Sequence, residues 1–200
     1  MKSTALSIFG FAALAAVSSA QTKTFNVVGD KLAYRNLATF ESVSDYETFT
    51  GRTNEVSGSL KFDPTTKKGS GKIVVSVKGI DTGIPLRNEH MQSAGWLDAA
   101  NYPTISFEAI KAVNVGGDRY KVTGKLSLHG VTKTVNADVR LGYRAAGPEV
   151  VAKGFNGDLV KVTANFKVKL SDYGVKIPDM AAGKVANEVT VSLTAYATTK

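Results

Sequence analysis

The side chains that could do chemistry are few, and they do not form a known catalytic set. The chain has two histidines, His90 and His129, and no cysteine. Four carboxylates near His90 in the sequence could supply an acid–base pair: Asp81, Glu89, Asp98 and Glu108. Neither histidine has carboxylates at metal-ligand spacing, and no serine stands in a nucleophile-elbow motif. We interpret the carboxylates as solvated loop residues and expect no catalytic residues, no metal and no cofactor.

The first twenty residues have the features of a secretory signal peptide. Lys2 supplies a positive charge, residues 5–17 are mostly apolar, and Ser18-Ser19-Ala20 offers small residues before a cleavage site. The apolar run is too short to cross a bilayer comfortably. We therefore expect a leader at 1–20, one domain at 21–200, and a periplasmic or secreted mature protein. A domain of this size can bury enough apolar surface to fold without disulfides.

The mature chain is basic, but its charges are dispersed. Removing Lys2 with the leader lowers the formal charge from +8 to +7. The basic residues alternate along expected strands, as Lys161, Lys167 and Lys169 do, and they form no stripe with interleaved aromatic residues. This pattern and the export signal disfavour nucleic acid as a partner. It leaves open a weak, transient contact with an anionic membrane surface.

Apolar and polar residues alternate with period two over most of the chain, which predicts strands with one buried and one solvated face. In residues 119–129, for example, Tyr120, Val122, Leu126 and Leu128 share one face. The expected strands are 32–43, 53–63, 71–80, 104–115, 119–129, 131–144, 158–171 and 187–199.

Short connections such as His129-Gly130 join consecutive runs, so neighbours in sequence should pair as antiparallel hairpins. Eight strands with one apolar face can close into an up-and-down barrel or split into a sandwich. We favour the barrel because closure leaves no exposed edge. Small inward residues such as Ala137 and Ala164 hint at a cavity, although they also relieve crowding at bends.

Residues 85–98 break the alternation. Leu86, His90 and Met91 recur at helical spacing, which predicts a short helix with one apolar side. Such a helix could gate one mouth of a barrel, or Met91 and Trp96 could merely cap its core. The barrel itself could also be filled and serve a structural role in the cell envelope.

Two motifs in this chain resemble the signatures of a known family. Residues 87–109 (RNEHMQSAGWLDAANYPTISFEA) and residues 122–135 (VTGKLSLHGVTKTV) are similar to those of the YceI-like, lipocalin-like polyisoprenoid-binding proteins. The resemblance runs from about residue 33 to 198. One departure is that Asn36 to Ser42 stand where the family usually has His-Ser near the first strand.

The resemblance implies an antiparallel eight-stranded barrel, with a helix over one mouth and a long isoprenoid lipid inside. The lipid would be an isoprenoid quinone or a polyprenyl compound, and dimers occur in the family. We expect these residues to line the cavity: Phe40, Val75, Val77, Leu86, Met91, Trp96, Ile105, Phe107, Leu126, Leu128, Val139, Phe166 and Val168. Arg87, Asn88 and His90 could meet a polar head group at the mouth. The alternatives are an envelope module without ligand and a weak enzyme that uses His90.

Overall fold

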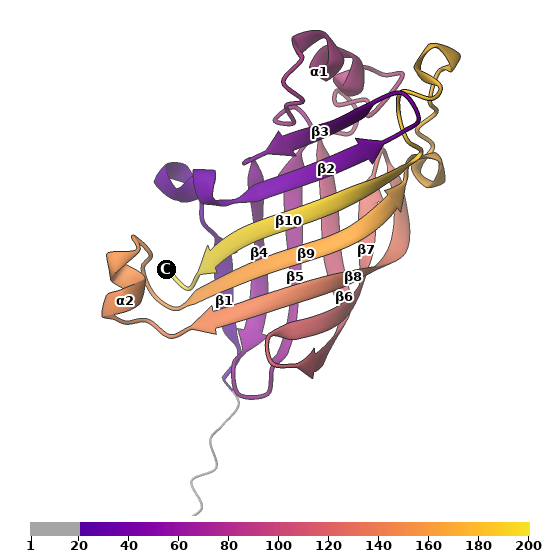
Figure 1. Cartoon of the computed structure of the whole chain (residues 1–200). Coiled ribbons are helices and arrows are strands. Elements are labelled where there is room, and N and C mark those ends of the chain that lie inside the picture. The colour runs from indigo at the N-terminus through magenta and orange to yellow at the C-terminus, as the bar shows by residue number, and fades with distance from the viewer. Residues whose placement is uncertain (1–20) are drawn as a thin grey trace, which may run out of the picture.

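The computed structural model describes residues 21–200, which form a single twisted antiparallel sheet with short helices at its ends (Figure 1). The strands are β1 (Lys23–Val27), β2 (Leu37–Val43), β3 (Thr48–Thr53), β4 (Val56–Asp63), β5 (Lys68–Ser76), β6 (Thr104–Gly116), β7 (Arg119–Leu128), β8 (Val131–Arg144), β9 (Leu159–Lys169) and β10 (Glu188–Thr198). The α-helices are α1 (Pro85–Gln92) and α2 (Pro148–Ala152), and the 3₁₀ helices are η1 (Asp30–Arg35), η2 (Leu170–Tyr173) and η3 (Asp179–Ala181). No helix between residues 21 and 200 is long and apolar enough to cross a membrane.

Eight of these strands close into a ring. The order is β1-β4-β5-β6-β7-β8-β9-β10, and β1 returns to β10 through the pairs Asn26–Thr198 and Val27–Ala197. All these pairings are antiparallel. The ring confirms the predicted eight-stranded antiparallel barrel with a short helix near one end. The predicted leader at 1–20 lies outside the described residues.

The hairpin of β2 and β3 extends the sheet beyond the eight-stranded ring: β2 corresponds to the predicted strand 32–43, whereas β3 was not predicted. β2 pairs with residues 190–194 of β10, on the same edge that β1 occupies at residues 197 and 198. Beyond β3 the wall continues only through a single bridge between Arg52 and Asp81. In Figure 1 the hairpin stands at the upper end of the barrel with α1 above it. The upper rim is therefore completed by a helix-bearing loop, not by a strand ladder.

Several strand boundaries differ from the alternation pattern. Residues 30–35 form η1, so the expected run 32–43 becomes a strand only at Leu37. β5 ends at Ser76, before the expected limit of 80. β1 and β3 were not predicted as strands, because their inward faces carry too few apolar residues to establish a period. These residues are Phe25 and Val27 in β1 and Phe49 in β3.

The interior contains two hydrophobic clusters, one above the other along the barrel axis. The lower cluster is solid and consists of Phe25, Leu60, Phe62, Tyr120, Val122, Val160 and Ala197. Phe25 and Val160 within it are fully buried. The upper cluster consists of Leu126, Leu128, Val168, Tyr173, Val175 and Val189. Because β7 and β9 contribute to both clusters, the same strand face supplies the lower core and the wall of the upper half.

Asn36 is fully buried at the point where β1 and β2 part on the edge of β10. Its Nδ2 donates to the Val28 carbonyl at 2.7 Å, and its Oδ1 accepts the Tyr196 N–H at 3.0 Å. Its own carbonyl accepts a hydrogen bond from the Asn54 side chain. The side-chain amide thus takes the place that a strand backbone would fill, and it pairs the Val28 carbonyl and the Tyr196 N–H.

We expect Asn36→Ala to lower the free energy of unfolding by about 2–4 kcal/mol, because it leaves a buried donor and a buried acceptor without partners. Denaturant unfolding at neutral pH measures this change. The control is Asn136→Ala, since Asn136 is exposed on the outer face of β8. The control should stay within about 0.5 kcal/mol of the parent protein. Equal losses in the two variants would contradict the role of the junction.

A buried carboxylate fastens the closed end of the barrel. Asp158 Oδ2 lies 2.5 Å from Lys23 Nζ and accepts the Tyr143 hydroxyl at 2.9 Å, and Oδ1 accepts the Ala146 N–H at 2.7 Å. Burial alone would raise the pKa of Asp158, but the bonds from Lys23, Ala146 and Tyr143 outweigh it and lower the pKa below its usual value. The bond from Asp158 in turn raises the pKa of Lys23.

A carboxylate whose folded pKa is lowered stabilises the protein above its unfolded pKa of about 4, and this contribution is lost as the pH falls through the folded pKa. We expect Asp158→Asn to lower the Tm at pH 7 by roughly 3–8 °C and to flatten the loss of Tm below about pH 4. Thermal unfolding from pH 7 to pH 2 measures both effects. The control Asp138→Asn removes an exposed pair with Lys121 and should change the Tm by less than about 2 °C. A parent-like acid limb in Asp158→Asn would contradict this assignment.

Candidate ligand-binding site

The upper half of the barrel encloses an apolar cavity of about 440 Å³. Its wall comes from strands that belong to different parts of the chain. Phe40 projects from β2, Val75 from β5, Ile105 from β6 and Phe166 from β9, and Leu128 ends β7. The volume and the apolar lining are typical of sites that bind small apolar molecules.

The alternation of β7 shows why these side chains face the cavity. Tyr120, Val122, Gly124, Leu126 and Leu128 are all buried, and the lysines between them are exposed. Tyr120 and Val122 belong to the lower cluster, whereas Leu126 and Leu128 line the cavity. One face of one strand therefore passes from solid core to open space within a few residues.

The structure places ten of the thirteen expected lining residues at the cavity wall: Phe40, Val75, Leu86, Met91, Trp96, Ile105, Leu126, Leu128, Phe166 and Val168. Two of the three residues expected at the mouth, Arg87 and His90, also border the cavity. The strand residues come together because they share the inward face. Leu86, Met91 and Trp96 reach the cavity because α1 and the turn after it lie across the upper end.

Four expected site residues lie elsewhere. Val77 follows the end of β5, where its N–H bonds to the Pro103 carbonyl, and its side chain is buried away from the cavity. Val139 packs against the lower cluster. Phe107 packs between the two clusters, below the cavity wall. The Asn88 side chain accepts bonds from Thr82 and donates to Asp81, so it holds the loop before α1 and does not face the mouth.

The sequence analysis missed the segment 170–185, which forms the other side of the mouth. It carries η2 and η3 and lines the cavity with Leu170, Val175, Pro178, Met180, Ala181, Lys184 and Val185. The Ala186 N–H donates to the hydroxyl of the buried Ser42, which ties this segment to β2. The segment shows neither the period of two of a strand nor the period of 3.6 of a helix. Only its scattered apolar residues could have indicated that it packs on the barrel.

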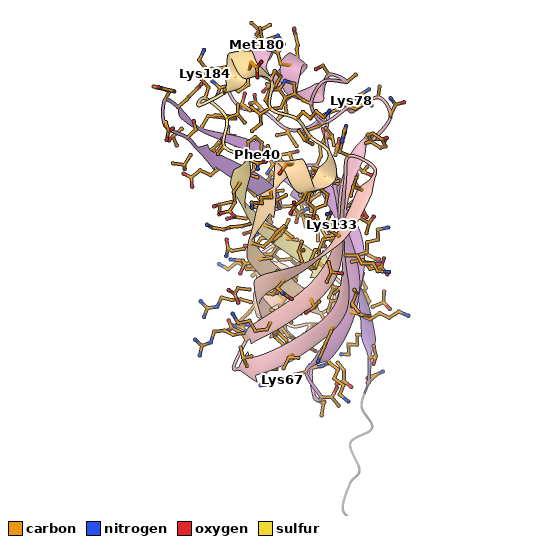
Figure 2. All side chains as sticks on the ribbon, turned by 90° about the vertical axis from the view of Figure 1, so that its right-hand side faces the viewer. Phe40, Lys67, Lys78, Lys133, Met180 and Lys184 are labelled. Carbon is orange, nitrogen blue, oxygen red and sulfur yellow. The ribbon has the colours of Figure 1, made fainter. Side chains whose placement is uncertain are left out.

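Opposite the segment 170–185, α1 covers the mouth of the cavity as a lid. Arg87 pairs with Glu47 and lies over the Phe49 ring, with its guanidinium carbon 4.2 Å from the ring centroid. These contacts join the helix to the beginning of β3. In Figure 2, Met180 and Lys184 lie at the upper end of the molecule and Phe40 lies below them. Ile84, Leu86 and Met180 border the mouth with 47%, 58% and 83% of their surface exposed.

The polar side chains at the mouth could bind a polar group. Four of them border the cavity: Glu47, Arg87, His90 and Lys184. Asp81 accepts the Gly83 N–H and the Asn88 amide, which lower the pKa of its carboxyl. Asp98 binds the Asn101 side chain. Across residues 21–200, no three His, Cys, Asp or Glu side chains are grouped to hold a metal ion.

Comparisons with known proteins give consistent matches over most of the chain. The family model described as a YceI-like domain matches residues 17–197. A UPF0312 protein of Pseudomonas aeruginosa is 31% identical over 158 residues, which are 74% of this chain and 73% of that protein. A UPF0312 protein of Vibrio cholerae is 27% identical over 180 residues, which are 88% of this chain and 90% of that protein.

Two solved structures share the fold. The crystal structure of BcnA from Burkholderia cenocepacia matches with a TM-score of 0.70 and 25% identity, and the match covers 83% of this chain and 98% of that one. The polyisoprenoid binding domain from Saccharophagus degradans matches with a TM-score of 0.63 and 18% identity, over 89% and 99% of the two chains.

Trp96 is the chain's one tryptophan and borders the cavity, so it can report directly on an apolar molecule inside. We expect the apolar dye N-phenyl-1-naphthylamine to bind and to receive excitation energy from Trp96. Ala38→Phe fills part of the cavity without adding charge and should weaken dye binding roughly tenfold, or by about 1.4 kcal/mol. The control Leu37→Phe enlarges the neighbouring exposed side chain and should bind as the parent does. Unchanged affinity in Ala38→Phe would place the dye outside the cavity.

Proposed function

The chain belongs to the YceI-like domain family, and from this premise we propose that it is a carrier that binds a long-chain isoprenoid lipid in its barrel cavity. The lipid is an isoprenoid quinone or a polyprenyl compound. The structurally similar domain from Saccharophagus degradans is a polyisoprenoid binding domain, which supports this ligand class for a barrel of the same fold. The protein binds its ligand and needs no cofactor.

The observation that carries the proposal is the apolar cavity beneath α1. Its wall offers almost no hydrogen-bonding group, so affinity comes from removing apolar surface from water. Burying roughly 400 Å² of an isoprenoid chain contributes on the order of 10 kcal/mol, before the cost of ordering the ligand and the lid. Selectivity then depends on shape, which suits a flexible hydrocarbon chain better than a compact polar metabolite.

The polar groups at the mouth suit the head group of such a lipid. Arg87 and Lys184 are cationic and His90 can donate or accept a hydrogen bond, and all three border the cavity. In this proposal they contact a quinone oxygen or a polyprenyl hydroxyl or phosphate while the tail lies below. Asn88 is left out of the head-group site because its side chain is engaged with Thr82 and Asp81.

The proposal includes export and short-lived contact with membranes. The expected cleavage after Ala20 would place the mature protein in the periplasm or outside the cell. Ile84, Leu86 and Met180 expose apolar surface beside the mouth, and this surface could touch a bilayer while the lipid is exchanged. The homodimer implied by the family resemblance stays a prediction.

Two alternatives concern the same barrel. A weak enzyme would use His90, but Glu47, a carboxylate that also borders the cavity, is paired with Arg87 and is not free to act as an acid–base partner. An envelope module without ligand would have no use for an apolar cavity. A cavity of about 440 Å³ favours binding, because leaving such a space empty forfeits packing contacts.

We expect organic-solvent extraction of the purified protein to release about one isoprenoid lipid per chain, identified by mass spectrometry. Leu128→Arg places a charge in the cavity wall and should reduce the extracted lipid at least tenfold. The control Lys125→Glu changes an exposed residue of the same strand and should carry as much lipid as the parent protein. Thermal unfolding verifies that each variant is folded. A parent protein without lipid, or equal lipid in folded forms of all three, would reject the carrier.

A further inference from the structure

The cavity is closed at its lower end. Below Leu126 and Phe166, the interior is filled by the lower cluster, in which Phe25 and Val160 are fully buried and Phe62 is 3% exposed. Asp158, with Lys23 and Tyr143, fastens the strands around that end. A molecule in the cavity can therefore extend toward the mouth but not through the barrel.

Two aromatic rings form the boundary between the cavity and the solid core. The ring centroids of Phe107 and Phe166 lie 5.9 Å apart, and the rings are inclined by 30°. Phe166 faces the cavity, and Phe107 packs against both clusters. We call this pair the aromatic floor.

A glycine makes room for the floor. A Cβ atom at Gly124 would lie 2.3 Å from Phe107 Cζ, so only glycine lets the ring rest against β7 at this height. Gly124 lies opposite Ala109 in the pairing of β6 and β7, and Phe107 lies opposite Leu126. The ring is thus directed down the barrel, over the glycine, and blocks the passage between the two clusters.

We infer that the aromatic floor limits the length of prenyl chain that the cavity encloses, an inference that rests on the proposed carrier function. At the packing density of protein interiors, one five-carbon isoprene unit occupies on the order of 100 Å³. The cavity of about 440 Å³ then holds roughly four units. The ligand class is a lipid with about four isoprene units enclosed, and any longer tail extends past Ile84, Leu86 and Met180 at the mouth.

The affinity for prenyl alcohols of increasing length tests this limit. The probes are geraniol, farnesol, geranylgeraniol and a nine-unit prenyl alcohol, each used below its aggregation limit to displace N-phenyl-1-naphthylamine. We expect affinity to rise at least tenfold per added unit up to about four units, because each unit buries more apolar surface. Beyond four units it should change less than about threefold, since further units stay largely in water.

Phe107→Ala tests the floor itself. Phe107 does not line the cavity, so removing its ring should alter binding only if the floor sets the depth. For each protein, the affinity for a six-unit prenyl alcohol is divided by the affinity for geranylgeraniol. We expect this ratio to be at least fivefold higher in the variant than in the parent protein. Phe107→Leu removes less volume and should give a smaller shift in the same direction. It also serves as the folded variant if the alanine form is unstable.

The control is Phe155→Ala, which also removes a phenylalanine ring, but from a separate cluster outside the barrel. It should lower the Tm but keep the parent's chain-length preference, which separates loss of stability from loss of the floor. Affinity that rises steadily to nine units, or a preference unchanged in the folded Phe107 variants, would overturn the inference and leave the carrier intact. Failure of every prenyl alcohol to displace the dye would overturn the carrier function and the inference together.

Discussion

One edge of β10 carries two different strands, and the cavity depends on the point where they part. β1 occupies residues 197 and 198 of that edge, and β2 occupies residues 190–194. Below the junction the ring has eight strands and is packed solid, whereas above it β2 and β3 form the wall beside β10. Asn36 satisfies the hydrogen bonds that this division would otherwise leave unmade. Its side-chain amide replaces the missing strand backbone between Val28 and Tyr196.

The period of two predicted which side chains face inward but not how high they lie along the barrel. Phe166 and Val168 line the cavity as expected, but Val139, equally inward, packs in the lower cluster. Height depends on the register between strands and on the stagger of a closed sheet, and neither is written in one strand's own sequence. For the same reason Phe107, which lies opposite Leu126, could be assigned to the barrel interior but not to its floor.

The sequence predicted the local backbone conformation where a tight turn constrains it. His129 and Gly130 both have positive φ, 49° and 74°, as the two-residue connection predicted. The conformation of the segment 170–185 could not be predicted from the sequence, because it depends on contacts with residues far away in the chain. Tyr173 and Val175 are 2% exposed through packing on the upper cluster, and the bond to Ser42 joins residues far apart in sequence. Tertiary contacts of this kind leave no local pattern.

The two ends of the molecule are secured differently. The closed end is fastened by the buried Asp158 carboxylate, whereas α1 at the mouth is joined to the barrel by the partly exposed Arg87–Glu47 pair, and exposed pairs contribute little stability. The cavity has a single opening, so in the proposed carrier the part of a lipid that enters first lies deepest and leaves last. The end of the lipid nearest the opening is then the first to emerge.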